Sequence, residues 1–521
     1  MSKGKMVAVC VWGLVSLVAV AATYKLWWVP RGERIAAEQV AQEKFDKETQ
    51  EQVVLDSTSS NSQYKHIIPV SHDWFTGYDI LRSSENVAYN RRSEIKLTFN
   101  DDGADGVQRL KDLASGKTQV GVFTIGSLIK SCAEGGYAPE DIPVSIVAFI
   151  DETRGADMAV AYKKTFPNID AINHPETKLV LIGNSPSETF ARILLTNFKF
   201  SQLPKDPFIF VDSPKALFDH YRKSSPEDRY VYITWQPWGT KILDNPNAHT
   251  LIDSSRFKGY IVDVIVVNRD YLYKNPDVVQ TIVENYYRSV FDTKDTRVEL
   301  AIKDAAASGE PLSQTQAEAL VDGVWWKNTQ EAYGHFGLGN QTLQHVEDMI
   351  TNLTRVLIKS GSIKSDPTGG RPNLLYFDGV MKKMHAANFH PGFAPEAVRN
   401  ETRTLGPLDE SQWGKLIPVG TLDVPILVFR RGSYSLTDTS KVHLDGLVKT
   451  LNTFPSYYCL VNGDASTKGD LDANQALALG RANAAKDYLV SQGIDKDRIS
   501  AVAGMPSGQT AVRFQFGEAP Y

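Results

Sequence analysis

Short β-rich runs alternate with helical stretches between residues 64 and 385, and this alternation limits the possible folds more than any other feature of the chain. Strands that alternate with helices predict mostly parallel sheets, in which ligands bind at the carboxyl ends of the strands. The fold class expected for this region is therefore α/β. The runs are KHIIPV, EIKLTF, VGVFTI, VSIVAFI, MAVAYK, KLVLIG, FIFVDS, YVYIT and YIVDVIVV.

Several pieces of this region, taken in order, carry a family resemblance. They resemble the periplasmic solute-binding proteins of the nitrate, sulfonate and thiamine-precursor group. The resemblance implies two lobes, joined by a hinge, that close around a small molecule, and it makes an ABC permease a candidate partner. The pieces are SHDWFTGYDIL, RLKDLASGKTQVGVFTIGS, DETRGADMAVA, SPKALFDHYRKSSPEDRYVYITWQPW and TLIDSSRFKGYIVDVIVVNRDYLYKNPDVV.

Aromatic residues crowd the loop after the first of these runs. Trp74, Phe75 and Tyr78 are candidate ligand residues, because aromatic faces can sandwich a bound molecule. Packing of one or two of these rings into the first lobe is the structural alternative. The resemblance adds Thr124, which ends a strand that faces the cleft in the family.

A helix start supplies a second group of candidates. Ser185 and Ser187, in GNSPSETF, lie where free backbone N–H groups and the helix dipole can bind an anion. Capping of the helix alone would also explain these residues.

The ITWQPW stretch supplies a third group. Trp235 and Gln236 lie where the resembled family has a tryptophan and an acid at the mouth of the cleft. Gln236 replaces that acid, which argues against a cationic ligand. Asp263 is an acid within an apolar strand, so it must be paired or face the cleft, and a structural role at the hinge is the favoured interpretation.

The last hundred residues form a separate module. A long amphipathic helix contains Asn474, Leu477 and Arg481, and about Val419 to Tyr521 resembles the OmpA-like peptidoglycan-binding domains. The resemblance implies that Asn474 and Arg481 contact peptidoglycan. Ser466 stands at the position of the family's aspartate, so we expect weakened or altered binding.

The first 30 residues favour a membrane anchor. Met6 to Tyr24 has no charged residue, and at ~1.5 Å per residue this stretch spans most of a ~30 Å hydrocarbon core. Lys3 and Lys5 predict a cytoplasmic N-terminus, an inner-membrane location and a periplasmic bulk. A signal peptide cleaved after Ala21 is the alternative, which would release the chain into the periplasm.

Polar composition places the remaining boundaries. Residues 31–63 read as a stalk and linker, and residues 386–418, rich in proline, glycine and charge, read as a second linker. The predicted domains are therefore an anchor or signal at 1–30, a two-lobed domain at 64–385 and the OmpA-like domain at 419–521.

The sequence gives no support to several other classes of protein. A net charge of −5 gives no indication of nucleic-acid binding, and three dispersed cysteines cannot form a disulfide framework. SLIK at Ser127 matches S-x-x-K without its companion motifs, and the histidines lack metal-ligand spacing. We therefore expect no catalytic residue, metal or cofactor.

These observations lead to one main hypothesis. The chain is predicted to be a membrane-anchored periplasmic receptor that captures a small anionic or neutral solute and associates with the cell wall. A tether between membrane and wall without ligand binding is the first alternative. An enzyme of thiamine-precursor type is the second.

Overall fold

The computed structural model describes residues 63–339, 343–399, 405–430, 432–464, 467–504 and 512–520. The predicted anchor and all of the predicted stalk except Gln63 lie outside these ranges. Among the helices in the described ranges, none has both the length and the apolar character that a membrane crossing requires.

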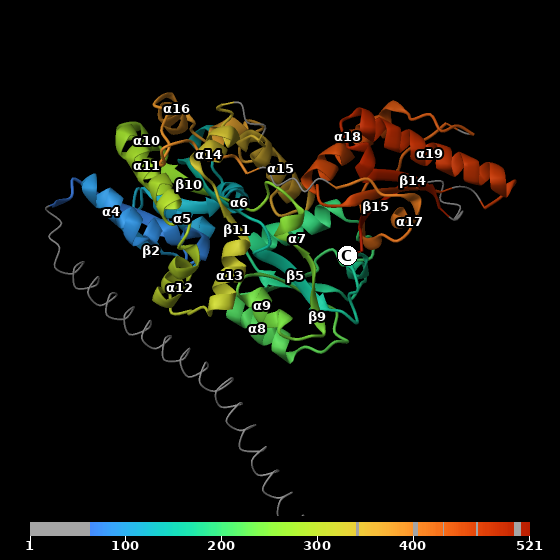
Figure 1. Ribbon diagram of the computed structural model, residues 1–521, viewed down its shortest axis with the longest axis horizontal. Coiled ribbons are helices and arrows are strands. Elements are labelled where there is room, and N and C mark those ends of the chain that lie inside the picture. Colours follow the sequence, from blue (N-terminus) through green and yellow to red (C-terminus); the bar gives the residue numbers. More distant parts are fainter. Residues whose placement is uncertain are drawn as a thin grey trace, which may run out of the picture. The chain divides into compact units, whose positions relative to one another are not determined.

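Lobe one is built on a six-stranded sheet with the order β11-β4-β10-β3-β1-β2. Its interior strands β4, β10 and β3 are buried along their whole length, which explains their nearly continuous apolar sequence. Helices pack around the sheet (Figure 1). The strands are β1 (His66–His72), β2 (Ile95–Asp101), β3 (Val120–Thr124), β4 (Val144–Thr153), β10 (Val262–Asn268) and β11 (Val324–Trp326). The helices are α3 (Asp79–Arg82), α4 (Ser84–Arg92), α5 (Gly106–Ala114), α6 (Ile125–Gly135), α10 (Arg269–Lys274), α11 (Pro276–Asp292), α12 (Arg297–Ala307), α13 (Gln314–Asp322), α14 (Thr329–His335), α15 (Val346–Lys359) and α16 (Gly379–Ala386).

Lobe two is built on a five-stranded sheet with the order β7-β6-β8-β5-β9. Its helices α7, α8 and α9 each begin with a proline or follow one directly, which suits the first turn because proline lacks the N–H that is unpaired there. The elements are β5 (Asp157–Tyr162), β6 (Lys178–Ile182), α7 (Pro186–Asn197), β7 (Phe208–Val211), α8 (Pro214–Lys223), β8 (Tyr230–Trp235), α9 (Trp238–Leu243) and β9 (Ala248–Asp253).

The chain crosses between the lobes twice, from β4 to β5 and from β9 back to β10. The returning strand β10 enters lobe one antiparallel to both of its neighbours, and β5 is antiparallel to both neighbours in lobe two. Both sheets are therefore mixed. Five of their nine described strand pairings are antiparallel, so the expectation of mostly parallel sheets is wrong. Hydrogen bonds hold the first crossing, between β4 and β5, in place. The carbonyl oxygen of Gly323 accepts from the amides of Arg154 and Ala156.

The two lobes are joined by more than the crossings. Helix α15 packs against α6 of lobe one and α7 of lobe two. Lys130 of α6 forms a 2.8 Å ion pair with Glu188 of α7, and Arg192 of α7 donates a 2.8 Å hydrogen bond to the carbonyl oxygen of Ser360, just after α15. These contacts hold the lobes against each other.

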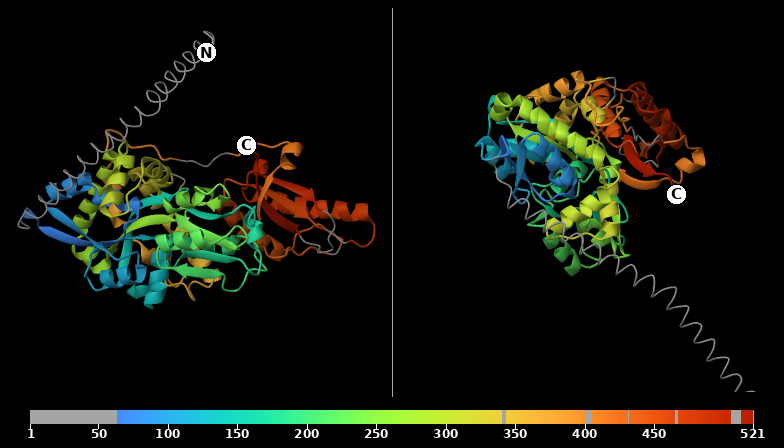
Figure 2. Two further views of the ribbon diagram at one scale, coloured as in Figure 1. Left: turned by 90° about the horizontal axis from the view of Figure 1, so that it is seen from below. Right: turned by 60° about the vertical axis from the view of Figure 1, so that its left-hand side comes forward.

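The C-terminal module, residues 417–520 as far as they are described, has a four-stranded sheet with the order β12-β15-β13-β14. Helices α18 and α19 lie side by side next to this sheet (Figures 1 and 2). The elements are β12 (Ile417–Thr421), α18 (Asp438–Thr453), β13 (Tyr458–Gly463), α19 (Leu471–Ser491), β14 (Ile499–Ala503) and β15 (Val512–Glu518), and α17 (Glu410–Trp413) precedes them.

The C-terminal module packs on lobe two. The amide of Lys199 donates to the carbonyl oxygen of Thr421, and the amide of Asp423 donates to that of Asn197. Phe198 and Phe257 of lobe two contact the ring of Phe454, with ring centroids 5.8 Å apart in both pairs. Two segments predicted as independent domains therefore share a buried aromatic cluster.

The described part of the predicted linker at residues 386–418 also packs on lobe one. The hydroxyl of Tyr333 donates a 2.8 Å hydrogen bond to the carbonyl oxygen of Phe389. Arg399 forms a 2.7 Å ion pair with Glu331. Both partners lie on α14, so this segment is held along that helix before the chain reaches the C-terminal module.

Candidate functional site

A cavity of about 130 Å³ lies between the two lobes. Both lobes contribute to its wall, so any molecule bound there would contact both. Lobe one contributes Asp73, Phe75, Tyr78, Gly103, Ala104, Gly106, Arg109, Phe123, Thr124, Ser127, Thr153, Ile261 and Asp263, and lobe two contributes Asp157, Ile182, Asn184, Ser185, Pro186, Asp212, Pro214 and Trp235.

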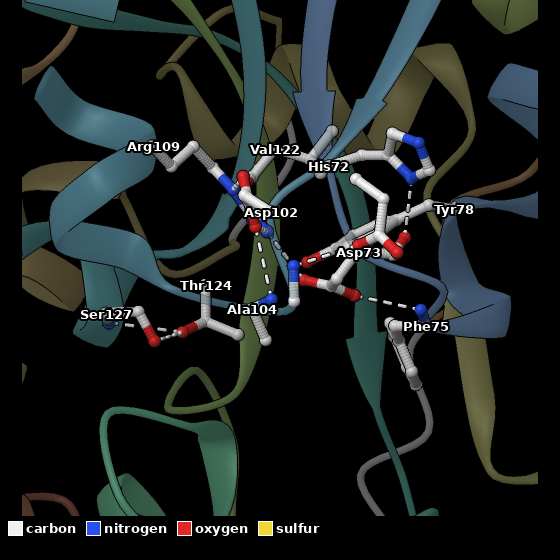
Figure 3. Close-up of polar contacts among 12 residues, drawn as sticks. His72, Asp73, Phe75, Tyr78, Asp102, Ala104, Arg109, Val122, Thr124 and Ser127 are labelled. Atoms are coloured by element: carbon white, nitrogen blue, oxygen red, sulfur yellow. Dashed lines mark hydrogen bonds and ion pairs between the residues drawn. The ribbon is translucent and has the colours of Figure 1, made fainter. Parts of the chain in front are cut away.

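Arg109 is the buried centre of the lobe-one wall (Figure 3). Its Nε donates to Asp102 Oδ2 at 2.7 Å, and its Nη2 contacts Asp102 Oδ1 at 2.5 Å and Asp73 Oδ2 at 2.8 Å. Its Nη1 donates to the carbonyl oxygen of Val122. The guanidinium thus links strand β3, the loop after β2 and the loop after β1.

Each charge in this group changes the pKa of its neighbours. Burial opposes ionisation of Asp73, but Arg109 outweighs that effect and holds the pKa of this carboxyl below its usual value. Burial likewise opposes the charge of Arg109, but Asp102 and Asp73 hold its pKa above the usual value. Burial raises the pKa of Asp102 despite its bonds to Arg109.

A second carboxyl group lies on the cavity wall at Asp263. The hydroxyl of Tyr78 donates a 2.5 Å hydrogen bond to Asp263 Oδ1. Asp151 pairs with Asp263 across strands β4 and β10. Burial, together with the charge of Asp263, raises the pKa of Asp151 well above its usual value, and burial raises the pKa of Asp263 to about 7. Burial thus favours the protonated forms of Asp151 and Asp263, whereas Asp73 beside Arg109 favours the ionised form.

Gly77 allows this arrangement. A Cβ atom at this position would lie 2.3 Å from the ring of Phe75 and 2.7 Å from Asp151 Oδ2. Any side chain at Gly77 would displace the aromatic ring from the cavity or the carboxyl from its site. The glycine is required by close approach, since its φ is not in the left-handed region.

A third carboxyl, Asp157, comes from lobe two. Asp157 is the first residue of β5 and lies opposite Trp235 on the neighbouring strand β8, and it is 2% exposed. Its Oδ1 and the hydroxyl of Thr153 each lack a partner with hydrogen-bond geometry among the described residues. Burial raises the pKa of Asp157 to about 7, although the nearby Thr153 hydroxyl opposes the shift.

The structure brings five of the predicted ligand residues to this cavity, namely Phe75, Tyr78, Thr124, Ser185 and Trp235. Thr124 also caps α6, since its Oγ1 accepts from the amide of Ser127 at 3.1 Å. Ser185 donates its hydroxyl hydrogen to the carbonyl oxygen of Ile182 at 2.7 Å. Ligand binding by these residues stays a prediction.

The other three predicted residues lie outside the cavity wall. Trp74 is 39% exposed, and the guanidinium of Arg82 covers its ring at 4.9 Å. Ser187 is fully buried within α7. Gln236 caps α9, because its Oε1 accepts from the amide and hydroxyl of Thr240.

The start of α7 already holds a carboxylate. Glu188 Oε2 accepts a 2.8 Å hydrogen bond from the amide of Asn184 and lies 2.8 Å from Lys130 Nζ. The carboxylate thus occupies one backbone N–H group just before α7, and Ser185 at the helix start lines the cavity. Anion binding at this helix start stays a prediction.

The sequence interpretation did not include Asp73, Arg109 and Asp157. Asp157 could have been found from its position at the start of the apolar run DMAVAY, since a carboxyl in a buried strand needs a partner or a ligand. Arg109 lies on the buried face of α5 with Leu110 and Leu113, and the same argument applies to it. No group of metal-ligating side chains was found in the described ranges.

In the C-terminal module, Arg481 lies on α19 and is mostly buried. Its Nε donates to the carbonyl oxygen of Ser433 at 3.2 Å, and its guanidinium lies 5.1 Å from the ring centroid of Phe429. Asn474 Nδ2 donates to the carbonyl oxygen of Lys468 at 2.9 Å. Ser466 lies outside the described residues, whereas Asp464, just after β13, lies 3.7 Å from Arg513.

The C-terminal module is similar in sequence to known proteins. Residues 428–515 match the model of the OmpA family. A stretch of 77 residues is 31% identical to the peptidoglycan-associated lipoprotein of Rhizobium meliloti (strain 1021). This stretch covers 15% of the chain and 44% of that relative, so the chain spans less than half the length of the curated protein that it matches.

Solved structures similar to the two-lobed part include binding proteins of bacterial transporters. The periplasmic aliphatic sulphonate binding protein SsuA of Escherichia coli is 14% identical, with a TM-score of 0.46, over 59% of this chain and 97% of that chain. The periplasmic nitrate-binding protein NrtA of Synechocystis PCC 6803 is 10% identical, with a TM-score of 0.46, over 62% of this chain and 88% of that chain. Residues 428–515 thus match the OmpA family, and the described residues form a mixed α/β fold.

Proposed function

We propose that this protein is a solute receptor of the bacterial envelope, which holds a small molecule between its lobes and associates with the cell wall through its C-terminal module. The observation that carries the proposal is the cavity of about 130 Å³, which takes its wall from both lobes. Sites between lobes suit ligand capture, because a ligand that contacts both walls stabilises the closed state.

A thermal-shift screen of the full chain tests solute capture. The panel contains inorganic anions, sulfonates, amines and pyrimidines, and a ligand at 100 times its Kd adds about 2.7 kcal/mol to stability. Binding in the cavity should be lost in Phe75→Ala and Trp235→Ala, whereas Trp74→Ala is the matched control, because Trp74 lies outside the wall. Equal loss in all three variants would contradict the cavity as the site.

The proposed contact with the bacterial cell wall rests on the C-terminal module. The exposed ring of Tyr434 lies against Gly480 of α19, and Arg481 donates to the carbonyl oxygen of the neighbouring Ser433. A pull-down of the full chain with purified peptidoglycan should be weakened in Arg481→Gln. Lys441→Gln, on the exposed surface of α18, is the control. Retention of both variants at wild-type level would exclude the role of Arg481.

A second candidate function is a tether without ligand. The ion pair between Lys130 and Glu188 and the packing of α15 on both lobes hold the lobes together by contacts of the chain itself. A screen without any stabilising solute, combined with a positive pull-down, would favour this function. The proposed inner-membrane anchor belongs to either candidate, whereas an ABC permease is a proposed partner of the solute receptor alone.

A further inference from the structure

The wall of the cavity carries more acidic than basic groups. Among the described residues that line it, four are aspartates, namely Asp73, Asp157, Asp212 and Asp263, and one is basic, Arg109. An anion placed here would meet carboxyl groups from both lobes. A cation would meet acceptors from both lobes.

The positive charge of Arg109 does not make the cavity wall attractive to an anion. Its guanidinium is held by two carboxylates, at 2.8 Å for Asp73 and 2.5 Å for Asp102, and by the carbonyl oxygen of Val122. An anion would have to compete with both aspartates for the same N–H groups. The ion-paired group as a whole, one guanidinium and two carboxyls, offers no excess positive charge.

Asp157 is the acceptor that this arrangement leaves unused. It is buried, its Oδ1 has no hydrogen-bond partner among the described residues, and it lies on the cavity wall. A buried carboxyl oxygen without a partner costs free energy, which a bound N–H donor would recover. The Thr153 hydroxyl lies near this carboxyl but lacks hydrogen-bond geometry to it. The charged groups around it are Asp263 on β10 and, elsewhere on the same wall, Asp73, Asp212 and Arg109.

Aromatic and aliphatic side chains supply the rest of the wall. Phe75 and Phe123 come from lobe one and Trp235 from lobe two, with Ile182 and Ile261 beside them. Aromatic faces attract cations as well as apolar groups. The volume of about 130 Å³ is close to that of a cavity that holds benzene.

We infer that the cavity binds a small organic cation of the ammonium or amidinium class, whose N–H groups donate to Asp157 and whose body contacts the aromatic wall. This inference rests on the proposed solute capture and names its chemical class. It differs from the anionic or neutral solute expected from the sequence. Gln236, which argued against a cation in that expectation, lies outside the cavity wall and bonds to Thr240, and the Asn184 amide before α7 already bonds to Glu188.

Two sets of nearly isosteric probes separate charge from shape. Acetamidinium, acetamide and acetate form the small set, and benzamidinium, benzamide and benzoate form the larger set. We expect the full chain to bind one of the cations at least tenfold more tightly than its neutral and anionic counterparts, measured by calorimetry. Tighter binding of acetate or benzoate would overturn the inference.

Single-residue variants then test whether the bound cation donates to Asp157. Asp157→Asn keeps the shape of the side chain and should weaken the cation at least tenfold, with little change for the neutral amide. Trp74→Ala should leave cation binding unchanged, and Trp235→Ala should weaken both cation and amide. Circular dichroism establishes that each variant is folded. Cation binding that survives Asp157→Asn would contradict the inference.

The dependence on pH is a separate readout. Because burial holds the pKa of Asp157 at about 7, the ionised acceptor increases about tenfold between pH 6 and pH 8, and cation affinity should rise by a similar factor. The rise should be absent in Asp157→Asn. If an anion or neutral solute from the wider panel binds through Phe75 and Trp235, the cation inference fails and solute capture stands. If no solute binds at all, both fail.

Discussion

The hydroxyl of Tyr78 donates a 2.5 Å hydrogen bond to Asp263 Oδ1. Tyr78 lies in the short helical turn after β1, and Asp263 lies in the strand by which the chain returns from lobe two. Both side chains are buried. The contact therefore couples a wall of the cavity to the crossing between the lobes.

Removal of this hydroxyl should destabilise the protein. Tyr78→Phe leaves a buried carboxyl without its donor, and we expect a loss of about 1–3 kcal/mol in the free energy of unfolding. Urea denaturation measures it. Tyr273→Phe is the control, since Tyr273 is 64% exposed and its change should stay within about 0.5 kcal/mol. Equal effects of the two variants would show that the bond contributes nothing.

Stability should depend on pH through Asp157. Burial raises its folded pKa to about 7 from an ordinary value of 3.8, so between pH 4 and pH 7 the folded chain keeps a proton that the unfolded chain has lost. This contribution is complete below the unfolded pKa and is lost as pH rises through the folded pKa, with a slope of at most about 1.4 kcal/mol per pH unit.

Asp157→Asn should remove this part of the profile. The difference in unfolding free energy between wild type and variant, measured in urea at several pH values, should change across pH 4–7 and be constant above about pH 8. Asp277→Asn, with a side chain that is 90% exposed, controls for the loss of one carboxylate. A difference that is flat across the whole range would refute the raised pKa.

Arg109 should be essential to lobe one. Arg109→Met leaves Asp73 and Asp102 as buried carboxyls without their cation, and we expect a loss of about 3–5 kcal/mol. Lys215→Met removes an exposed pair with Asp219 and should change the free energy of unfolding far less than Arg109→Met, because solvent screens exposed pairs.

A combined variant distinguishes charge from packing at this site. Arg109→Met with Asp73→Asn and Asp102→Asn should recover part of the lost stability, because the uncompensated carboxyls are gone. No recovery in urea denaturation would show that Arg109 acts through the packing of its stem instead.

The aromatic cluster should couple the C-terminal module to lobe two. Phe454→Ala opens a hole between Phe198 and Phe257, with an expected loss of about 3–5 kcal/mol. Limited proteolysis should then cleave the chain near the module more rapidly. Ile426→Ala is the control, since Ile426 is 72% exposed. Identical cleavage patterns in wild type and Phe454→Ala would mean that the module is held by other contacts.

The sequence by itself determined the elements and the modules. Apolar strand runs and helix caps depend on local spacing, which is why the α/β class was predicted from residues close together in the chain, whereas the C-terminal module was predicted from its family resemblance. Local patterns proposed Phe75, Tyr78 and Ser185, and the family resemblance added Thr124 and Trp235. The structure places all five on the cavity wall.

Only the tertiary structure decided which charges meet. Asp73, Asp102 and Arg109 are separated by up to 36 residues, and Lys130 and Glu188 by 58, and no local pattern pairs them. The structure also separated Trp74 and Gln236 from the cavity, since Arg82 and Thr240 engage them instead. The free-energy cost of an unpaired charge depends on its burial, and burial is a property of the folded chain. The charges and hydrogen-bonding groups of the cavity could therefore be assigned only from the tertiary structure.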